Sequence, residues 1–207
     1  YVPEFLEDII EKNLNCIQFI TTPNNSLPLF NGANSNQLNQ LEKYLEKNKP
    51  NLKQNILGGL YKMKYKNHFF IMDVEKPPQK RFSKSYQSGP LSFEYFLDGI
   101  KIISNSGFGN NISKKAELLS RVTACQSTLT INDTSVTSFE KNEIINKVFG
   151  NSIKNSFKSL NITLTNNTDV IGCSASNNGY EKSFGCTHKR EIYINKKDNY
   201  LKGIDHI

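Results

Sequence analysis

The spacing of apolar residues changes near residue 56, and this change constrains the fold more than any other feature of the sequence. Before it, Phe5, Ile9 and Leu14 recur near the 3.6-residue period of a helix that buries one face. After it, Leu60–Tyr65 alternates between apolar and polar residues, as a half-buried strand does. Helical and β-type segments that are separated along the chain indicate an α-part followed by a β-part.

We expect two helices before residue 51. The first begins after Pro3, where a missing N–H costs no helical hydrogen bond, and it ends before Pro23. The second carries Leu38, Leu41 and Leu45 on one face.

Two hairpins are the clearest β-type features. Residues 60–65 and 68–72 flank a Lys-Asn turn, and residues 91–96 and 100–103 flank Asp98-Gly99, a strong two-residue hairpin signal. Further short strands are expected at Ser127–Ile131, Ser159–Thr165, Val170–Ser174, Tyr180–Cys186 and Glu191–Ile194. Many short strands separated by turn residues predict an antiparallel β-sandwich or barrel.

The net charge of +7 is consistent with a solvated basic surface or with an anionic partner: nucleic acid, a membrane surface or an acidic polysaccharide. The lysines are scattered and no nucleic-acid motif accompanies them, so we expect no nucleic-acid partner. We also expect no membrane span, because no run of about 20 apolar residues exists. The four cysteines form no Cys-x-x-Cys pair, which argues against a zinc cluster of the usual spacing.

A series of short segments occurs in the same order as in one known group of proteins. The segments are Leu27-Pro28-Leu29-Phe30-Asn31-Gly32-Ala33, Asp73-Val74-Glu75-Lys76-Pro77-Pro78, Gly89-Pro90-Leu91-Ser92-Phe93-Glu94, Asn105-Ser106-Gly107, Arg121-Val122-Thr123-Ala124-Cys125-Gln126-Ser127-Thr128-Leu129, Gly179-Tyr180, Phe184-Gly185, His188-Lys189-Arg190 and Gly203-Ile204-Asp205. Together they resemble bacterial heparinase II/III-like proteins. Glu75 departs from the pattern, since a glycine stands there in the family.

This resemblance implies a mainly β fold, in which residues 1–50 form the end of an α/α-toroid and residues 51–207 form an incomplete antiparallel β-sandwich. It also implies β-elimination on a uronic-acid-containing, glycosaminoglycan-like polysaccharide in the periplasm or cell envelope. The chain begins with Tyr1 rather than Met and ends at Ile207, just after a strand-like stretch. We therefore expect it to be the C-terminal part of a polysaccharide lyase that is inactive without the missing toroid domain.

The resemblance also marks three positions where relatives often hold a sandwich metal. Here these positions carry the amides Gln87, Asn105 and Gln126. Zinc prefers histidine, cysteine and carboxylate ligands, so we expect no metal and no cofactor. We expect the amides instead to hydrogen-bond one another and to hold the same loops together without an ion. This substitution keeps a second hypothesis open, a non-catalytic glycan-binding or cell-envelope polysaccharide-related sandwich protein.

The resemblance draws attention to five candidate site residues, each with a structural alternative. Tyr180 and His188 are the catalytic candidates. Tyr180 either acts on substrate, as a base or a stacking surface, or is a core tyrosine. His188 either faces the cleft or belongs to a strand whose polar side chains are solvated. Arg121 either binds a sugar carboxylate through its planar fork or anchors its own loop by an internal ion pair. Arg190 would help His188 to position a carboxylate, and Asn31 either touches substrate or forms a turn.

Overall fold

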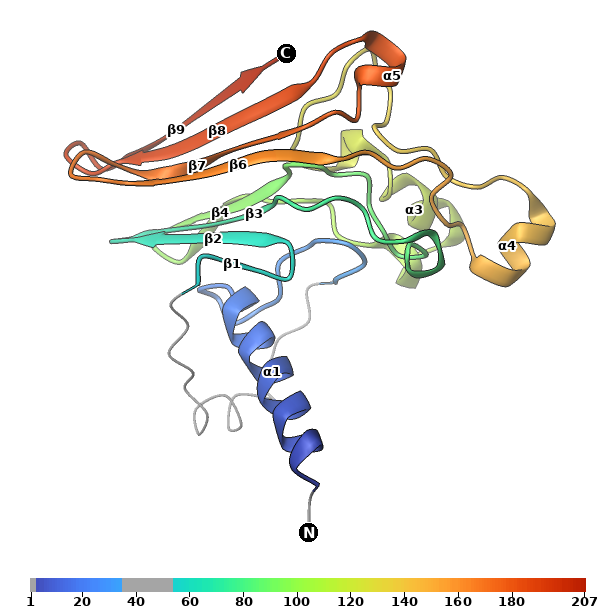
Figure 1. The fold of residues 1–207 in the computed structure, drawn as a ribbon, viewed down its shortest axis with the longest axis horizontal. Helices are drawn as coiled ribbons and strands as arrows, with labels where there is room; N and C mark the ends of the chain where they lie inside the picture. Colours follow the sequence, from blue (N-terminus) through green and yellow to red (C-terminus); the bar gives the residue numbers. More distant parts are fainter. Residues whose placement is uncertain (1–2, 35–53) are drawn as a thin grey trace.

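The chain folds into two antiparallel β-sheets stacked in layers, with an N-terminal helix on the outer side of the first sheet (Figure 1). The structure, a computed structural model, describes residues 3–34 and 54–207. The helix, α1 (Glu4–Ile20), approaches the sheet with its C-terminal end and projects away from it at its N-terminal end. The predicted mainly β fold is confirmed. The second predicted helix, at Leu38, Leu41 and Leu45, lies outside the described residues.

The first sheet has the strand order β1-β2-β3-β4-β5. Its strands are β1 (Ile56–Leu57), β2 (Leu60–Tyr65), β3 (His68–Asp73), β4 (Phe93–Leu97) and β5 (Ile100–Ile103). Both predicted hairpins are confirmed, and in the first of them Leu60 lies opposite Asp73 and Tyr65 opposite His68. The φ angles of Asp98 and Gly99 are 52° and 79°, so both turn residues have the positive φ that a type I′ hairpin requires.

The second sheet has the order β6-β7-β8-β9. Its strands are β6 (Ser159–Asn166), β7 (Val170–Asn177), β8 (His188–Asn195) and β9 (Tyr200–His206). Three of the short strands expected from the sequence are therefore present. The connections carry the short helices α3 (Lys114–Leu119), α4 (Glu143–Phe149) and α5 (Glu181–Phe184) and the 3-10 turns η1 (Lys80–Phe82), η2 (Gly109–Asn111) and η3 (Thr123–Cys125).

The strand predicted at Ser127–Ile131 is wrong. The Ser127 backbone N–H donates to the side-chain oxygen of Asn105 (2.9 Å), and the Thr128 hydroxyl donates to the carbonyl of Pro90 (2.6 Å). Ile131 makes an isolated bridge to Thr134. The segment is strand-like in its sequence pattern, but its hydrogen bonds go to side chains and loop carbonyls instead of a neighbouring strand.

The strand predicted at Tyr180–Cys186 is also wrong, since this segment forms α5. The backbone N–H of Gly185 donates to the carbonyl of Glu181 (2.8 Å), and Gly185 adopts a left-handed φ of 69°. A glycine in this conformation is a common helix terminator. The local helix-capping geometry therefore outweighs the apolar alternation in these residues.

The main apolar core lies between the two sheets. It contains Tyr61, Met63, Phe70, Met72, Val74, Leu91, Tyr95, Cys173, Ala175, Ile192 and Ile194. A smaller core on the opposite face of the first sheet contains Phe30, Phe69, Ile71 and Phe96. The second core places the segment after α1 across β3, so residues near Phe30 come close to the end of that strand.

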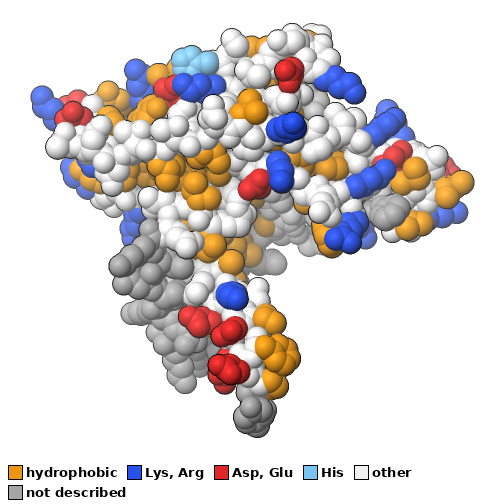
Figure 2. Space-filling view, in the orientation of Figure 1, with side chains coloured by type: hydrophobic (Ala, Val, Ile, Leu, Met, Phe, Trp, Pro, Cys, Tyr) orange, Lys and Arg blue, Asp and Glu red, His pale blue; other side chains and the backbone are white. Residues whose placement is uncertain are grey.

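The α1 helix carries an apolar stripe that the described residues leave open. Phe5 and Ile10 are 63% and 52% exposed, and Leu6 and Ile9 are also exposed. Figure 2 shows this hydrophobic side of the helix beside an acidic side. No helix of the described part of the chain is both long and apolar enough to cross a bilayer. An open stripe of this kind favours association through apolar surface.

We expect the 207-residue chain, expressed alone, to aggregate and to bind a hydrophobic dye through this stripe. The double variant Ile9→Lys/Ile10→Lys should lower both signals, measured by light scattering and dye fluorescence. Ile112→Lys is the control, since Ile112 is exposed but lies away from α1. A monodisperse wild-type chain that binds no dye would contradict this prediction.

Candidate functional site

The carboxyl group of Asp73 lies in the wall of a cleft at one end of the first sheet. Asp73 is the last residue of β3, a strand whose other five residues are all buried. The cleft has a volume of about 410 Å³. Its walls include Phe30, Asn31, Leu60, Glu75, Pro78, Phe82, Ser85 and Tyr86. The segment after α1, the β2–β3 hairpin and the η1 loop thus meet around the Asp73 carboxyl group, with Glu75 close by.

Asn31 and Glu75 hold the Asp73 carboxyl group in place. The Asn31 side-chain amide donates to Oδ2 of Asp73 (3.1 Å), and the backbone N–H of Glu75 donates to Oδ1 (3.2 Å). Asn31 has a φ of 48°, and the Asn-Gly turn that tolerates this angle directs its amide toward the strand. Asn31 is therefore a turn residue that also lines the cleft, and its contact with substrate stays a prediction.

Burial raises the pKa of Asp73 to about 7, while the two hydrogen bonds from Glu75 and Asn31 lower it in part. A carboxyl group of this pKa gains and loses a proton near neutral pH, which suits general acid–base chemistry. The neighbouring Tyr86 is also buried, and burial together with the Asp73 charge raises its pKa well above its usual value. Tyr86 therefore remains a neutral phenol beside Asp73.

Gln87 connects the Asp73 cleft to the adjoining loops. Its side-chain oxygen accepts from the backbone N–H of Gly32 (3.1 Å), next to Asn31. Its side-chain nitrogen donates to the carbonyls of Gly107 and Ser120, both at 2.8 Å. The buried side chain thus uses one acceptor and two donors to tie three segments together.

The three amides at metal-type positions do not fit a metal site. The side-chain nitrogens of Gln87 and Gln126 both donate to the carbonyl of Ser120 (2.8 Å each), which fixes their orientation toward that oxygen. The side-chain oxygen of Asn105 accepts from Ser127 (2.9 Å). Within residues 3–34 and 54–207, no group of three or more His, Cys, Asp or Glu side chains could hold an ion. The amides meet at Ser120 and Ser127 rather than bonding one another, and they hold loops together.

Arg190, His188 and Asp205 form a second cluster, on β8 and β9. Arg190 donates from Nε and Nη2 to the two Asp205 oxygens (2.7 and 2.9 Å), and Nε2 of His188 lies 2.8 Å from Oδ1 of Asp205. Nη1 of Arg190 reaches across to the carbonyls of Leu91 (2.7 Å) and Ser127 (2.8 Å). Arg190 therefore links the second sheet to the first sheet and to the amide-bearing loop.

Partial burial would by itself raise the pKa of Asp205. The hydrogen bonds and charges of His188 and Arg190 outweigh this effect and hold the pKa well below its ordinary range. Asp205 is therefore an anion at neutral pH, and an ionised carboxylate only accepts hydrogen bonds. His188, which is buried, must present an N–H to it at Nε2.

Replacing Arg190 with alanine should lower the free energy of unfolding by about 3 kcal/mol, because the carbonyls of Leu91 and Ser127 lose a charged donor and Asp205 keeps only His188. Arg190→Lys should restore only part of this, since an ammonium lacks the planar fork. The control is Lys189→Ala on the other face of β8, which should change stability by about 0.5 kcal/mol or less. Urea unfolding in the Ile9→Lys/Ile10→Lys background measures these values. Equal losses for Arg190→Ala and Lys189→Ala would contradict the structural role.

Arg121 is fully buried among the loops that connect the two sheets along the chain. Its guanidinium donates to the carbonyls of Tyr86 (2.8 Å), Ser83 (2.9 Å) and Asn151, and it lies 3.9 Å from the centre of the Phe139 ring. Burial lowers the pKa of Arg121 to about 10, so the group remains charged at neutral pH. Its anchoring contacts are carbonyls rather than the internal ion pair considered from the sequence.

Tyr180 is buried in the loop core that also contains Tyr86 and Val136. Its hydroxyl lies 3.1 Å from the carbonyls of both Leu129 and Thr134. Burial raises the pKa of Tyr180, which keeps the hydroxyl protonated. The geometry is that of a core tyrosine whose hydroxyl has partners.

The structure thus brings Asn31 and Gln87 to the Asp73 region, and it joins Arg190 and His188 through Asp205. Arg121 and Tyr180 lie in the loop core instead. The sequence interpretation did not single out Asp73 as a site residue. One signal was available, because a lone acid ends a strand whose preceding residues, His-Phe-Phe-Ile-Met, are mostly apolar.

The chain is similar to one known protein family and to several solved structures. Residues 48–207 match the family described as heparinase II/III-like, C-terminal. No curated protein matches the chain. A heparinase III structure is similar over 99% of this chain and 35% of that protein, at 16% identity and a TM-score of 0.68. A heparan sulfate lyase HepC mutant from Pedobacter heparinus is similar over 98% of this chain and 33% of that protein, at 19% identity and a TM-score of 0.66. The chain therefore spans about a third of the length of these proteins, and at these identities the likeness concerns the fold.

Proposed function

Because the chain belongs to the heparinase II/III-like C-terminal family, we propose that it is the β-sandwich part of a polysaccharide lyase that cleaves an acidic, uronate-containing glycan by β-elimination. Residues 1–50 would then be the end of an α/α-toroid and residues 51–207 the sandwich domain. The observation that carries the proposal is the family match over 48–207, the part of the chain that contains Asp73 and most of the residues lining its cleft. A periplasmic or cell-envelope location belongs to the same proposal.

The proposed reaction needs a base near the C5 proton of the uronate and a donor for the charge that develops on its carboxylate. Asp73 supplies a group that exchanges a proton near neutral pH, and Asn31 supplies an amide beside it. In this proposal Asp73 moves a proton in the cleft. Asn31 positions the Asp73 carboxyl, while Gln87 and Arg190 hold the surrounding loops.

The remaining groups would come from the toroid domain, so the isolated chain should not cleave the glycan. The test uses the full-length protein with a panel of acidic polysaccharides, including heparan sulfate and polygalacturonate. Each elimination creates an unsaturated uronate, which is measured by its ultraviolet absorbance. Product from the full-length protein but not from the 207-residue chain is the expected result. No product with any acidic polysaccharide would count against a lyase.

A second function is favoured by one observation, the amides at the three metal-type positions. Gln87, Asn105 and Gln126 hold loops through hydrogen bonds and do not fit a metal. A non-catalytic glycan-binding or cell-envelope polysaccharide-related protein would need only the sandwich surface. The same panel separates the two functions, because binding of an acidic glycan without any unsaturated product would support the second.

A further inference from the structure

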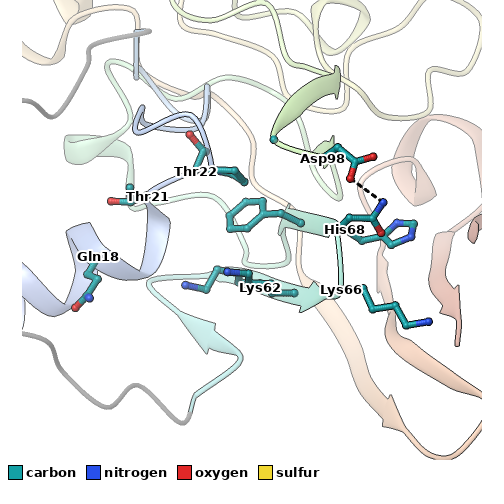
Figure 3. A pocket seen from close by; sticks show the side chains of 12 residues that line it. Gln18, Thr21, Thr22, Lys62, Lys66, His68 and Asp98 are labelled. Atoms are coloured by element: carbon teal, nitrogen blue, oxygen red, sulfur yellow. Dashed lines mark hydrogen bonds between the residues drawn. The ribbon is translucent and has the colours of Figure 1, made fainter. Parts of the chain in front are cut away.

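A second cleft lies at the other end of the β2–β3 hairpin, and it shares no residue with the Asp73 cleft. Its volume is about 760 Å³. Its lining combines the end of α1 with β2 and the two hairpin turns: Gln18, Thr21, Thr22, Pro23, Lys62, Lys64, Lys66, Asn67, His68, Phe69, Asp98 and Gly99. In Figure 3, Lys62 lies on the strand between Gln18 and Lys66, and Asp98 lies near the far turn.

The cleft is positively charged. Lys62 and Lys64 alternate along β2 and therefore project from the same face of the sheet, and Lys66 follows at the turn. One carboxylate, Asp98, also lines the cleft and accepts a hydrogen bond from Asn67 (3.1 Å). Three lysines and one aspartate leave a net charge of +2 on the lining.

The three lysines make no ion pair with a carboxylate within the described ranges 3–34 and 54–207. The Lys62 ammonium lies 4.4 Å from the centre of the Phe19 ring, and burial together with the charge of Lys64 lowers its pKa. A partly buried ammonium beside a second ammonium is stabilised by an anion bound between them.

The neutral part of the lining suits a sugar. Gln18, Thr21 and Asn67 present amide and hydroxyl groups, which can both donate to and accept from sugar hydroxyls. The Thr22 hydroxyl is buried and already bonded to Asn24 and Ser26. The aromatic residues there offer no platform for a nucleotide base, because Phe19 and Phe69 are buried. The lining chemistry therefore favours an acidic glycan over a nucleic acid.

The two clefts lie on one face of the same hairpin. In β3, Phe69 and Asp73 point to the side covered by the segment after α1, and that segment contributes Thr22 to one cleft and Asn31 to the other. His68 and Asp73, the two ends of β3, are about 17 Å apart along the strand, and the two linings come nearest at Leu60 and Lys62 on β2. A glycan of several sugar units could occupy both.

We propose that the lysine-lined cleft is a second binding subsite, which takes a carboxylate or sulfate group of an acidic polysaccharide chain that extends from the Asp73 cleft. The identity of the ligand as a glycan rests on the proposed function. Lys62 and Lys64 bind the acidic group, and Gln18 and Thr21 contact the sugar that carries it. The subsite increases the affinity for long chains and leaves the chemical step at Asp73 unchanged.

The experiment compares two double variants of the full-length protein that remove the same charge. Lys62→Gln/Lys64→Gln alters the cleft, and Lys115→Gln/Lys182→Gln alters exposed lysines on α3 and α5. Calorimetry with long and short oligosaccharides of heparan sulfate and of polygalacturonate distinguishes sulfate from carboxylate recognition, and neutral dextran oligosaccharides are the blank. The cleft variant should bind long acidic oligosaccharides about 10-fold or more weakly and short ones normally. The control variant should match the wild type for both.

Equal affinity of the wild type and the cleft variant for long chains would overturn the subsite, and so would an equal loss in the control variant. Lys64→Glu keeps the test valid if Lys62→Gln disturbs the packing on Phe19, because Lys64 is exposed. Failure of the proposed function looks different. Binding that depends on the lysines but gives no elimination product would support the subsite and contradict the lyase proposal. Elimination with an unchanged KM in the cleft variant would contradict the subsite and leave the lyase proposal in place.

Discussion

Asp73 is expected to make the free energy of unfolding fall by about 4 kcal/mol between pH 4 and pH 7, and the Asp73→Asn variant should not show this fall. Burial raises the pKa of the folded carboxyl to about 7 from an ordinary value of 3.8. As the pH rises through this window, the unfolded chain releases the proton and the folded chain retains it. The contribution of Asp73 to stability is therefore complete at low pH, falls as the pH rises and becomes constant above about 7.

Urea unfolding at a series of pH values, in the Ile9→Lys/Ile10→Lys background, gives the free energy of unfolding as a function of pH. The profile of the Asp73→Asn variant is subtracted from that of the protein with Asp73 intact. Asparagine resembles the protonated carboxyl in shape and cannot ionise. Asp198→Asn, at an exposed position on the β8–β9 turn, controls for the loss of one negative charge. Parallel profiles with and without Asp73→Asn would contradict the raised pKa.

The same substitution separates a catalytic Asp73 from a purely structural one. If Asp73 transfers a proton in the elimination, Asp73→Asn in the full-length protein should lower kcat by about 100-fold or more at unchanged fold. The wild-type rate should also depend on pH near 7. If the Asp73→Asn variant loses the pH dependence of stability but eliminates at the normal rate, Asp73 is a structural carboxyl. The family assignment would remain in place.

Replacing Arg121 with alanine should destabilise the protein by about 4 kcal/mol. The buried carbonyls of Ser83 and Tyr86 and the part-buried carbonyl of Asn151 would lose a charged donor, and a cavity would form against Phe139. Because Tyr86 lines the Asp73 cleft, the loop that shapes this cleft should loosen as well. Urea unfolding gives the stability change, and hydrogen exchange of residues 83–88 gives the local effect.

Two further variants show which property of Arg121 matters. Arg121→Met keeps most of the volume without any donor, and Arg121→Lys keeps the charge without the fork, so both should remain strongly destabilised. Lys115→Ala, at an exposed position on the neighbouring α3, should stay within about 0.5 kcal/mol of the wild type. A mild effect of Arg121→Ala accompanied by loss of glycan binding would instead favour the role in binding a sugar carboxylate.

Local sequence patterns were sufficient for the elements whose signals lie within a few residues. The alternation at Leu60–Tyr65 and the Asp98-Gly99 turn predicted the two hairpins, because side-chain direction and turn type depend on neighbouring residues. The same reasoning failed at Tyr180–Cys186, where a left-handed Gly185 ends a short helix. Alternation over so few residues does not distinguish a strand from one helical turn.

Residue order alone established a helical segment followed by antiparallel strands, and its motifs pointed to the family that residues 48–207 match. It did not establish what each polar side chain does, since that depends on burial and on distant partners. Asp73 meets Asn31, 42 positions away, and Arg121 meets carbonyls 30 to 38 positions away. Only the packing of the two sheets and their loops removes these groups from water, and that removal shifts the pKa of Asp73 and commits Arg121 to the loop core.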